Sequence, residues 1–194
     1  MYIIGISGQT GAGKSTAANI LSQLGYGENL EVDSIGHILL KNEETKKELR
    51  AAFGNDIFDE YGEIIRKELG AKAFTSKENT EKLNSIMHPA MVKMVREYIK
   101  QKEKEGKQYI IINAALLFKM KLDCLCDIIL YINSNQEIRL KRLIENRGMS
   151  KEAAQARLCS QDPMPENDNR IRIITNDTNK DDLYNKLKSI KFTK

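Results

Sequence analysis

Cysteine is scarce in this sequence of 194 residues, with only Cys124, Cys126 and Cys159 present. An odd number of thiols gives no complete disulfide framework, and three thiols are one short of a four-cysteine zinc site. The N-terminus enters a short apolar run directly and lacks the basic segment and long apolar stretch of a secretory signal. We therefore expect a cytoplasmic protein that folds without disulfides or a structural metal.

Long apolar runs and a strong net charge are also missing. No stretch approaches the ~20 apolar residues that a membrane-spanning helix needs. The 31 basic and 27 acidic residues leave a net charge of only +4, far from the density typical of a nucleic-acid-binding surface. We expect neither a membrane nor a nucleic acid as partner, and a small anionic substrate instead. The sequence carries no signal for an oligomeric state.

The remaining composition is that of a globular protein. Hydrophobic residues make up 41% and charged residues 30% of the chain, which is enough apolar material for a core and enough charge for solubility. At roughly 100–200 residues per domain, this length predicts one domain with a small insertion or lid.

Short apolar runs alternate with stretches of helical periodicity. Runs rich in β-branched residues are typical of strands buried on both faces of a parallel sheet, and strands that alternate with helices indicate an α/β protein. We predict a parallel sheet flanked by helices, with strands at residues 2–6, 109–112, 128–132 and, more weakly, 171–175.

Two segments stand apart from this alternation. Residues from about 33 to 106 are mostly helical in pattern, and we predict that they form a substrate-binding insertion in a core of about 1–32 and 107–194. In residues 142–161, Gly148 interrupts one helix and Ser150 begins another as an N-cap. We expect this second segment to be a lid.

Residues 8–15 match the phosphate-binding P-loop pattern in full, after a strand and before a helix expected at 16–24. Glycines let backbone N–H groups face an anion at the N-terminus of the following helix. In such loops the lysine reaches the β- and γ-phosphates and the serine hydroxyl binds Mg²⁺. The predicted ATP site comprises Gly8, Gly11, Ala12, Gly13, Lys14, Ser15 and Thr16, with Lys14 catalytic and Ser15 the Mg²⁺ ligand.

Other nucleotide-binding classes are less compatible with this chain. The Asn-Lys-x-Asp pattern that reads guanine in GTPases is missing, and the chain is short for a motor ATPase, which favours a small-molecule kinase. Such a kinase needs a carboxylate near the acceptor hydroxyl. Asp33 follows the apolar stretch 30–32 and opens a helix expected at 34–40, so it is the leading candidate for this carboxylate. It is also compatible with an ordinary helix N-cap, and one residue can fill both roles. Glu31 is a weaker second candidate.

An ordered set of motifs resembles the dephospho-coenzyme A kinase family. In that family the P-loop is followed by an Asp-x-Asp motif whose last aspartate is catalytic, and here this segment reads Glu31-Val32-Asp33. The family's later motifs follow in the same order, as Phe53-Gly54, Gly62 with Arg66, Leu83-Asn84, His88-Pro89, and a lid pattern from Arg142 to Gln161.

The resemblance implies a P-loop kinase that uses ATP and Mg²⁺ to phosphorylate the ribose 3′-hydroxyl of dephospho-coenzyme A, the last step of coenzyme A biosynthesis. It implies a catalytic role for Asp33, lid arginines at Arg142 and Arg147, and an ATP contact at Asn176. It also implies that Arg66 and His88 lie near the acceptor.

Judged from composition alone, a solvated helix position is favoured for Arg66. His88-Pro89 is likewise compatible with a helix start, since proline is favoured at the first helical position.

The chain also departs from the family pattern. Asn113, Ala115 and Lys119 stand where the family has an aspartate followed by a Pro-Leu-Leu-x-Glu motif, and Asn146-Arg147 replaces an Arg-Asp pair. These departures keep two alternatives open. One is a divergent P-loop kinase that acts on a nucleoside, a nucleotide or another small hydroxyl compound, and the other is a nucleotide-binding protein without catalysis.

Overall fold

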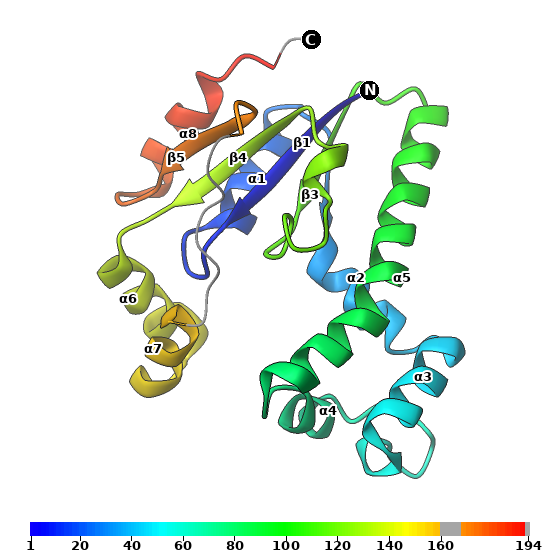
Figure 1. Cartoon of the computed structure of the whole chain (residues 1–194). Coiled ribbons are helices and arrows are strands. Elements are labelled where there is room, and N and C mark those ends of the chain that lie inside the picture. The colour runs from blue at the N-terminus through cyan, green and yellow to red at the C-terminus, as the bar shows by residue number, and fades with distance from the viewer. Residues whose placement is uncertain (160–167, 193–194) are drawn as a thin grey trace. The chain divides into compact units, whose positions relative to one another are not determined.

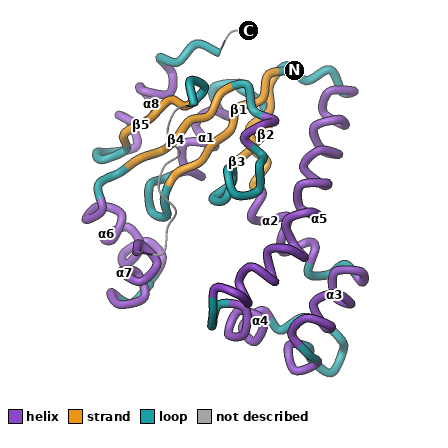
Figure 2. Tube along the Cα trace, viewed as in Figure 1, coloured by secondary structure: helices purple, strands orange, loops and turns teal. Residues whose placement is uncertain are grey.

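A computed structural model describes residues 1–159 and 168–192 of the chain. They form two compact units (Figures 1 and 2): a sheet unit of residues 1–31 and 101–194, and a helical unit of residues 32–100. Gln161, the last residue of the predicted lid, lies outside the described residues. In the part of the chain that is described, no helix combines the length and apolarity needed to cross a lipid bilayer.

The sheet unit is built on five strands in the order β2-β3-β1-β4-β5, and every neighbouring pair is parallel. The predicted parallel α/β fold is confirmed. β1 and β3 lie inside the sheet, where all of their isoleucines except the partly buried Ile3 are almost fully buried. The strands are β1 (Tyr2–Gly8), β2 (Glu28–Glu31), β3 (Tyr109–Asn113), β4 (Ile128–Asn133) and β5 (Ile171–Thr175).

Two helices, α1 (Lys14–Gln23) and α8 (Lys180–Lys188), pack against each other and contribute to one core with the sheet. Leu21 and Leu183 are buried there with Ile4, and full burial of each such side chain stabilises the fold by about 1.5–3 kcal/mol. Tyr26 packs edge-on against Phe192 in this core, with the ring centroids 4.5 Å apart. This packing fixes the N-terminal end of α1 beside the sheet.

The cysteines of the sheet unit are all free thiols. Cys126 is packed against Gly5 of β1, and it follows a short 3₁₀ turn, η2 (Asp123–Leu125). Burial raises the pKa of the Cys126 thiol to about 12, so this group behaves as a small apolar side chain.

A helical hairpin of α6 (Gln136–Arg147) and α7 (Lys151–Cys159) fills most of the predicted lid segment. Gly148 ends α6 in the left-handed conformation, with φ of 62°, and the Ser150 hydroxyl accepts a hydrogen bond from the Ala153 N–H. The predicted helix break and N-cap are thus confirmed. Leu143, with Ala154 and Leu158 of α7, forms a small core between the two helices.

The helical unit contains α2 (Val32–Leu39), α3 (Glu43–Phe53), the 3₁₀ turn η1 (Asn55–Ile57), α4 (Arg66–Ala73) and most of α5 (Lys77–Lys104). Asn42 caps α3 by accepting a hydrogen bond from the Thr45 N–H. The Lys46 ammonium, almost buried, pairs with the carboxylates of Glu43 and Glu63.

The helix start that His88-Pro89 left open as an alternative is not formed, because Pro89 lies inside α5. A proline in a helix interior removes one backbone hydrogen bond and normally kinks or ends the helix. Met87, Met91 and Val95 continue one buried stripe at four-residue spacing on both sides of Pro89. Burial of this stripe outweighs the local cost of the proline.

Candidate functional site

The P-loop connects β1 to α1, and its glycines occupy backbone conformations that other residues rarely adopt. Gly8, with φ of 140°, lies so close to the Ile132 carbonyl of β4 that a Cβ atom would overlap it. Gly13, with φ of 103°, forms the N-terminal boundary of α1. This left-handed residue lets the helix begin at Lys14, two residues earlier than the sequence predicts.

The loop carbonyls are held from one side by polar side chains. The Asn176 amide donates a hydrogen bond of 2.8 Å to the Ala12 carbonyl, and the Arg142 guanidinium makes longer contacts of 3.4 and 3.5 Å with the carbonyls of Gly11 and Ala12. In a trans peptide the C=O and the next N–H point in opposite directions. The Gly13 N–H is therefore directed away from Asn176, as an anion-binding loop requires.

The two side chains that follow the glycines have different partners. Lys14 Nζ donates to the loop's own carbonyl of Gly8 at 2.8 Å and, at 3.4 Å, to that of Gln9. The Ser15 hydroxyl donates to the Glu31 carboxylate at 3.1 Å. Lys14 thus lies folded along the loop, where its ammonium can exchange carbonyl oxygens for phosphate oxygens.

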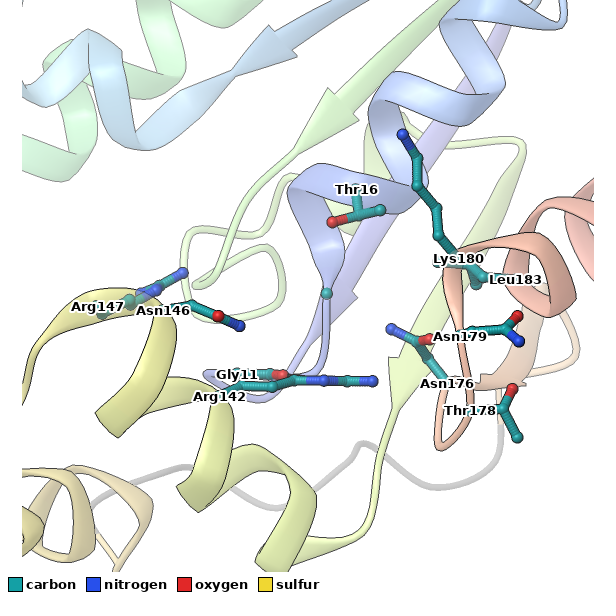
Figure 3. Close-up of a pocket in the computed structure, with 11 residues that line it drawn as sticks. Gly11, Thr16, Arg142, Asn146, Arg147, Asn176, Thr178, Asn179, Lys180 and Leu183 are labelled. Atoms are coloured by element: carbon teal, nitrogen blue, oxygen red, sulfur yellow. Dashed lines mark hydrogen bonds between the residues drawn. The ribbon is translucent and has the colours of Figure 1, made fainter.

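A pocket with a volume of about 340 Å³ opens beside the loop (Figure 3). Its volume lies within the ~300–1,000 Å³ range usual for small-molecule sites. Figure 3 shows the Arg142 side chain extending past Gly11 toward Asn176. The lining residues come from the P-loop and α1 (Gly11, Gly13, Thr16), from α6 (Arg142, Asn146, Arg147) and from the segment at α8 (Asn176, Thr178, Asn179, Lys180, Leu183).

Six of the sequence-predicted site residues meet at this pocket: Gly11, Gly13, Thr16, Arg142, Arg147 and Asn176. Gly8 lies beneath the loop at the end of β1, and the fully buried Ala12 contributes its carbonyl to the Asn176 contact. Asn176 is 6% exposed, and its hydrogen bond to the Ala12 carbonyl supports the loop.

Sequence reasoning missed Arg139, a buried arginine of α6. Its Nε donates to the Ser134 carbonyl at 3.0 Å, and its backbone packs against Gly11. Burial lowers the pKa of its guanidinium. Arg139 and Arg142 are three residues apart, which places both on one helix face. This spacing is the sequence signal that could have identified Arg139 as a neighbour of the P-loop.

Asp177, another residue that the sequence reasoning missed, lies in sequence between the pocket-lining residues Asn176 and Thr178. Its carboxylate accepts a hydrogen bond of 2.7 Å from the Asn135 N–H, which holds the pKa of Asp177 below its usual range. Because Asn135 is the N-cap of α6, this bond connects the start of the arginine-bearing helix to the segment after β5.

The predicted acceptor-side residues all belong to the helical unit. Asp33 is exposed in the first turn of α2, which begins at Val32, so the alternative of Asp33 as the helix N-cap is excluded. β2 ends at Glu31, and Val32, the last residue of the apolar stretch 30–32, is instead the first buried residue of the helix. Arg66 is the exposed first residue of α4, and His88 is half-buried in α5.

The residues that differ from the family pattern lie at the end of β3 and in the turns after it. Asn113 ends this strand and is 3% exposed, and its backbone pairs with both Glu31 of β2 and Ile6 of β1. Ala115 and Lys119 lie exposed in the turns that follow. The end of β3 therefore presents a neutral amide where a carboxylate was expected from the family pattern.

Oxygen donors at the loop fit a magnesium ion. The Ser15 hydroxyl and the Glu31 carboxylate are in hydrogen-bond contact, and both are ligand types that Mg²⁺ accepts alongside phosphate oxygens. Within the described residues, no cluster of three or more His, Cys, Asp or Glu side chains forms a self-contained metal cage. A metal bound here would depend on oxygens of a phosphate ligand.

Comparison with known proteins agrees with this geometry. The sequence profile of the dephospho-CoA kinase family matches residues 2–182. The dephospho-CoA kinase of Fusobacterium nucleatum is 35% identical over 191 residues, covering 96% of this chain and 95% of the relative. That of Corynebacterium diphtheriae is 36% identical over 187 residues, covering 94% and 92%.

Solved structures show the same similarity. The dephospho-CoA kinase of Campylobacter jejuni is 26% identical and superimposes with a TM-score of 0.64 over 95% of this chain and 92% of its own. A Thermus thermophilus structure reaches a TM-score of 0.77 at 27% identity, covering 97% of this chain and 95% of its own. The P-loop, the parallel sheet and these full-length matches together show that this chain belongs to the dephospho-CoA kinase family.

Proposed function

We propose that this chain transfers the γ-phosphoryl group of ATP to the ribose 3′-hydroxyl of dephospho-coenzyme A in the cytoplasm, with the P-loop holding the phosphates. The observation that carries this proposal is the P-loop itself, whose carbonyls are held by Asn176 and Arg142 on one side. Full-length similarity to dephospho-CoA kinases supports the acceptor.

The pocket beside the loop is our candidate for the adenosine part of ATP. It combines a 340 Å³ volume with amide groups from Asn146, Asn176 and Asn179 and with the guanidinium of Arg142. Amides offer both donors and acceptors to a purine edge, and a guanidinium can stack on an aromatic ring. The phosphates would then extend over Gly13 to Lys14 and Ser15.

Lys14 and Ser15 compensate the negative charge of the phosphates in different ways. Lys14 leaves its loop carbonyls and stabilises negative charge on the transferring group, an interaction that strengthens in the transition state. Ser15 would bind Mg²⁺, which when bound neutralises phosphate charge and orients the β- and γ-oxygens. Arg142 and Arg147 add positive charge from α6, and we propose that the α6–α7 hairpin acts as the lid.

Acceptor recognition is assigned to the helical unit. We propose that Asp33 accepts the proton of the 3′-hydroxyl or orients that hydroxyl, because it is an exposed carboxylate two residues beyond the end of β2. Arg66 and His88 would bind the acceptor's anionic and polar groups. In this proposal residues 32–100 form the substrate-binding insertion.

The test is product analysis with the purified chain, ATP, Mg²⁺ and dephospho-coenzyme A. The expected result is stoichiometric ADP and coenzyme A, with the new phosphate assigned to the 3′ position by phosphorus NMR. Nucleotide binding without a phosphorylated product would contradict the catalytic proposal, and a product phosphorylated elsewhere would contradict the assigned hydroxyl.

A further inference from the structure

Glu31 stands at a chemically distinctive position in the sheet unit. It is the last residue of β2, and its Oε1 accepts the 3.1 Å hydrogen bond of the Ser15 hydroxyl. In the parallel register, Glu31 is the partner of Asn113 at the end of β3. The first turn of α1, the end of β2 and the end of β3 therefore bring a hydroxyl, a carboxylate and an amide to the carboxyl ends of the strands.

The strand ends that surround the P-loop are otherwise uncharged. β1 ends at Gly8, β3 at Asn113 and β4 at Asn133, whereas β2 ends at Glu31. In P-loop proteins Mg²⁺ is commonly held by the loop's Ser or Thr hydroxyl and by an aspartate from a strand end. Asn113 offers only a neutral, 3% exposed amide at the strand next to β1. The one carboxylate that ends β1, β2, β3 or β4 is already in contact with Ser15.

We propose that Glu31 is the carboxylate of the magnesium site, replacing the charge that the end of β3 lacks. In this role Glu31 is a positioning residue. Its carboxylate orients the Ser15 hydroxyl and attracts the cation, and Ser15 and the phosphates bind the ion directly. The inference rests on the proposed ATP-binding function of the same loop, and it adds the source of the negative charge.

A purely structural role accounts less well for this contact. Ser15 and Glu31 are both exposed, and an exposed hydrogen bond of this kind adds little stability because water replaces either partner readily. Carboxylate and hydroxyl oxygens are ligands that Mg²⁺ accepts together with phosphate oxygens, and both lie beside this phosphate-binding loop. A bound metal ion therefore accounts best for the contact between Ser15 and Glu31.

The test measures Mn²⁺ binding, by electron paramagnetic resonance, to the chain saturated with a β,γ-imido analogue of ATP. Glu31→Gln keeps the shape and removes the charge, and we expect it to weaken Mn²⁺ binding by about 10–100-fold, the usual cost of losing such a group. Affinity for the analogue in EDTA, measured by calorimetry, should stay equal or rise, because one repulsive charge is gone.

Two further variants make the result specific. Glu28→Gln removes a carboxylate from the opposite end of β2, where Glu28 pairs with Lys102, and should leave Mn²⁺ binding unchanged. Asn113→Asp in the Glu31→Gln background returns a carboxylate to the end of β3 and should restore part of the affinity. Glu31→Ala is the second charge-removing variant, and thermal melts establish that each protein is folded.

Mn²⁺ affinity within twofold of the parent in folded Glu31→Gln or Glu31→Ala would overturn the inference, and so would an equal loss in Glu28→Gln. A parent protein with no metal binding in the analogue complex would overturn it together with the magnesium part of the proposed function. If Glu31-dependent metal binding persists in a protein that does not phosphorylate dephospho-coenzyme A, the inference stands and the proposed acceptor fails.

Discussion

The P-loop region and the helical unit present their candidate groups in different ways. At the P-loop, the backbone conformation is constrained by close neighbours, namely the amide of Asn176, the carbonyl of Ile132 and the chain around Arg139. In the helical unit the candidates Asp33 and Arg66 are exposed side chains on the first turns of helices. One region therefore presents constrained backbone groups, and the other presents separate exposed side chains.

This difference has a consequence for mutation. A site of backbone groups is sensitive to changes in conformation, since any shift of the loop moves several N–H groups together. An exposed side chain can be replaced with little effect on folding, so its removal reports on function alone. Each of the following predictions tests one side of this division.

Lys14→Ala should have the largest effect. Loss of an ammonium that stabilises the transition state costs about 10²–10³-fold in kcat, whereas ATP affinity should fall less because the loop amides remain. Steady-state kinetics and calorimetric ATP binding measure the two effects separately. Lys188→Ala, an exposed lysine near the end of α8, is the matched control. Near-normal turnover of Lys14→Ala would remove Lys14 from the mechanism.

Asp33→Asn should lower kcat by about 10²-fold or more, the scale of a general base, with ATP affinity unchanged. Its effect on stability should be small, since an exposed charge in a first helical turn contributes only ~0.3–1 kcal/mol through the helix dipole. Asp181→Asn changes an equivalent first-turn carboxylate on α8 and should leave kcat unaltered.

A stability loss without a kinetic loss at Asp33 would show that the carboxylate serves only the helix terminus. Equal kinetic losses in Asp33→Asn and Asp181→Asn would contradict the assignment of the acceptor side to the helical unit.

Arg142→Ala and Arg147→Ala should each lower kcat/KM, with the larger loss at Arg142. A charge-assisted hydrogen bond contributes about 1.5–3 kcal/mol, which corresponds to about 10–100-fold in rate. Arg142 already contacts the loop carbonyls, whereas Arg147 lies at the end of α6. Lys141→Ala, which removes an exposed neighbour on α6, controls for lost surface charge. Full activity in the double arginine variant would make the hairpin purely structural.

Gly13→Ala tests the backbone of the P-loop through the free energy of unfolding. A non-glycine residue in the left-handed region costs about 1–2 kcal/mol. At Gly13 the new Cβ would also displace the Asn176 amide, adding about 0.5–1.5 kcal/mol. Gly25→Ala, with φ of 90° and no neighbour within 4 Å, isolates the conformational part. Equal destabilisation of both variants would mean that Asn176 does not support the loop.

The sequence predicts the sheet and the P-loop well because both depend on strong local patterns. Four apolar runs correspond to strands, and the Gly-Lys-Ser pattern requires one backbone path. Local rules were misleading at Pro89, where the buried stripe of α5 outweighs a helix-breaking residue, and at Asp33, where Val32 is drawn into the helix. Arg139 and Asp177 escaped prediction because their importance arises from contacts between segments distant in sequence.

The measurement that most directly tests the central claim is a competition assay. The purified chain is given γ-phosphate-labelled ATP, Mg²⁺ and equimolar dephospho-coenzyme A, adenosine and adenosine monophosphate, and the labelled products are separated. The account predicts that the label enters coenzyme A almost exclusively and that this transfer is lost in Asp33→Asn while ATP binding persists. Preferential labelling of adenosine or its monophosphate, or unchanged transfer in Asp33→Asn, would contradict it.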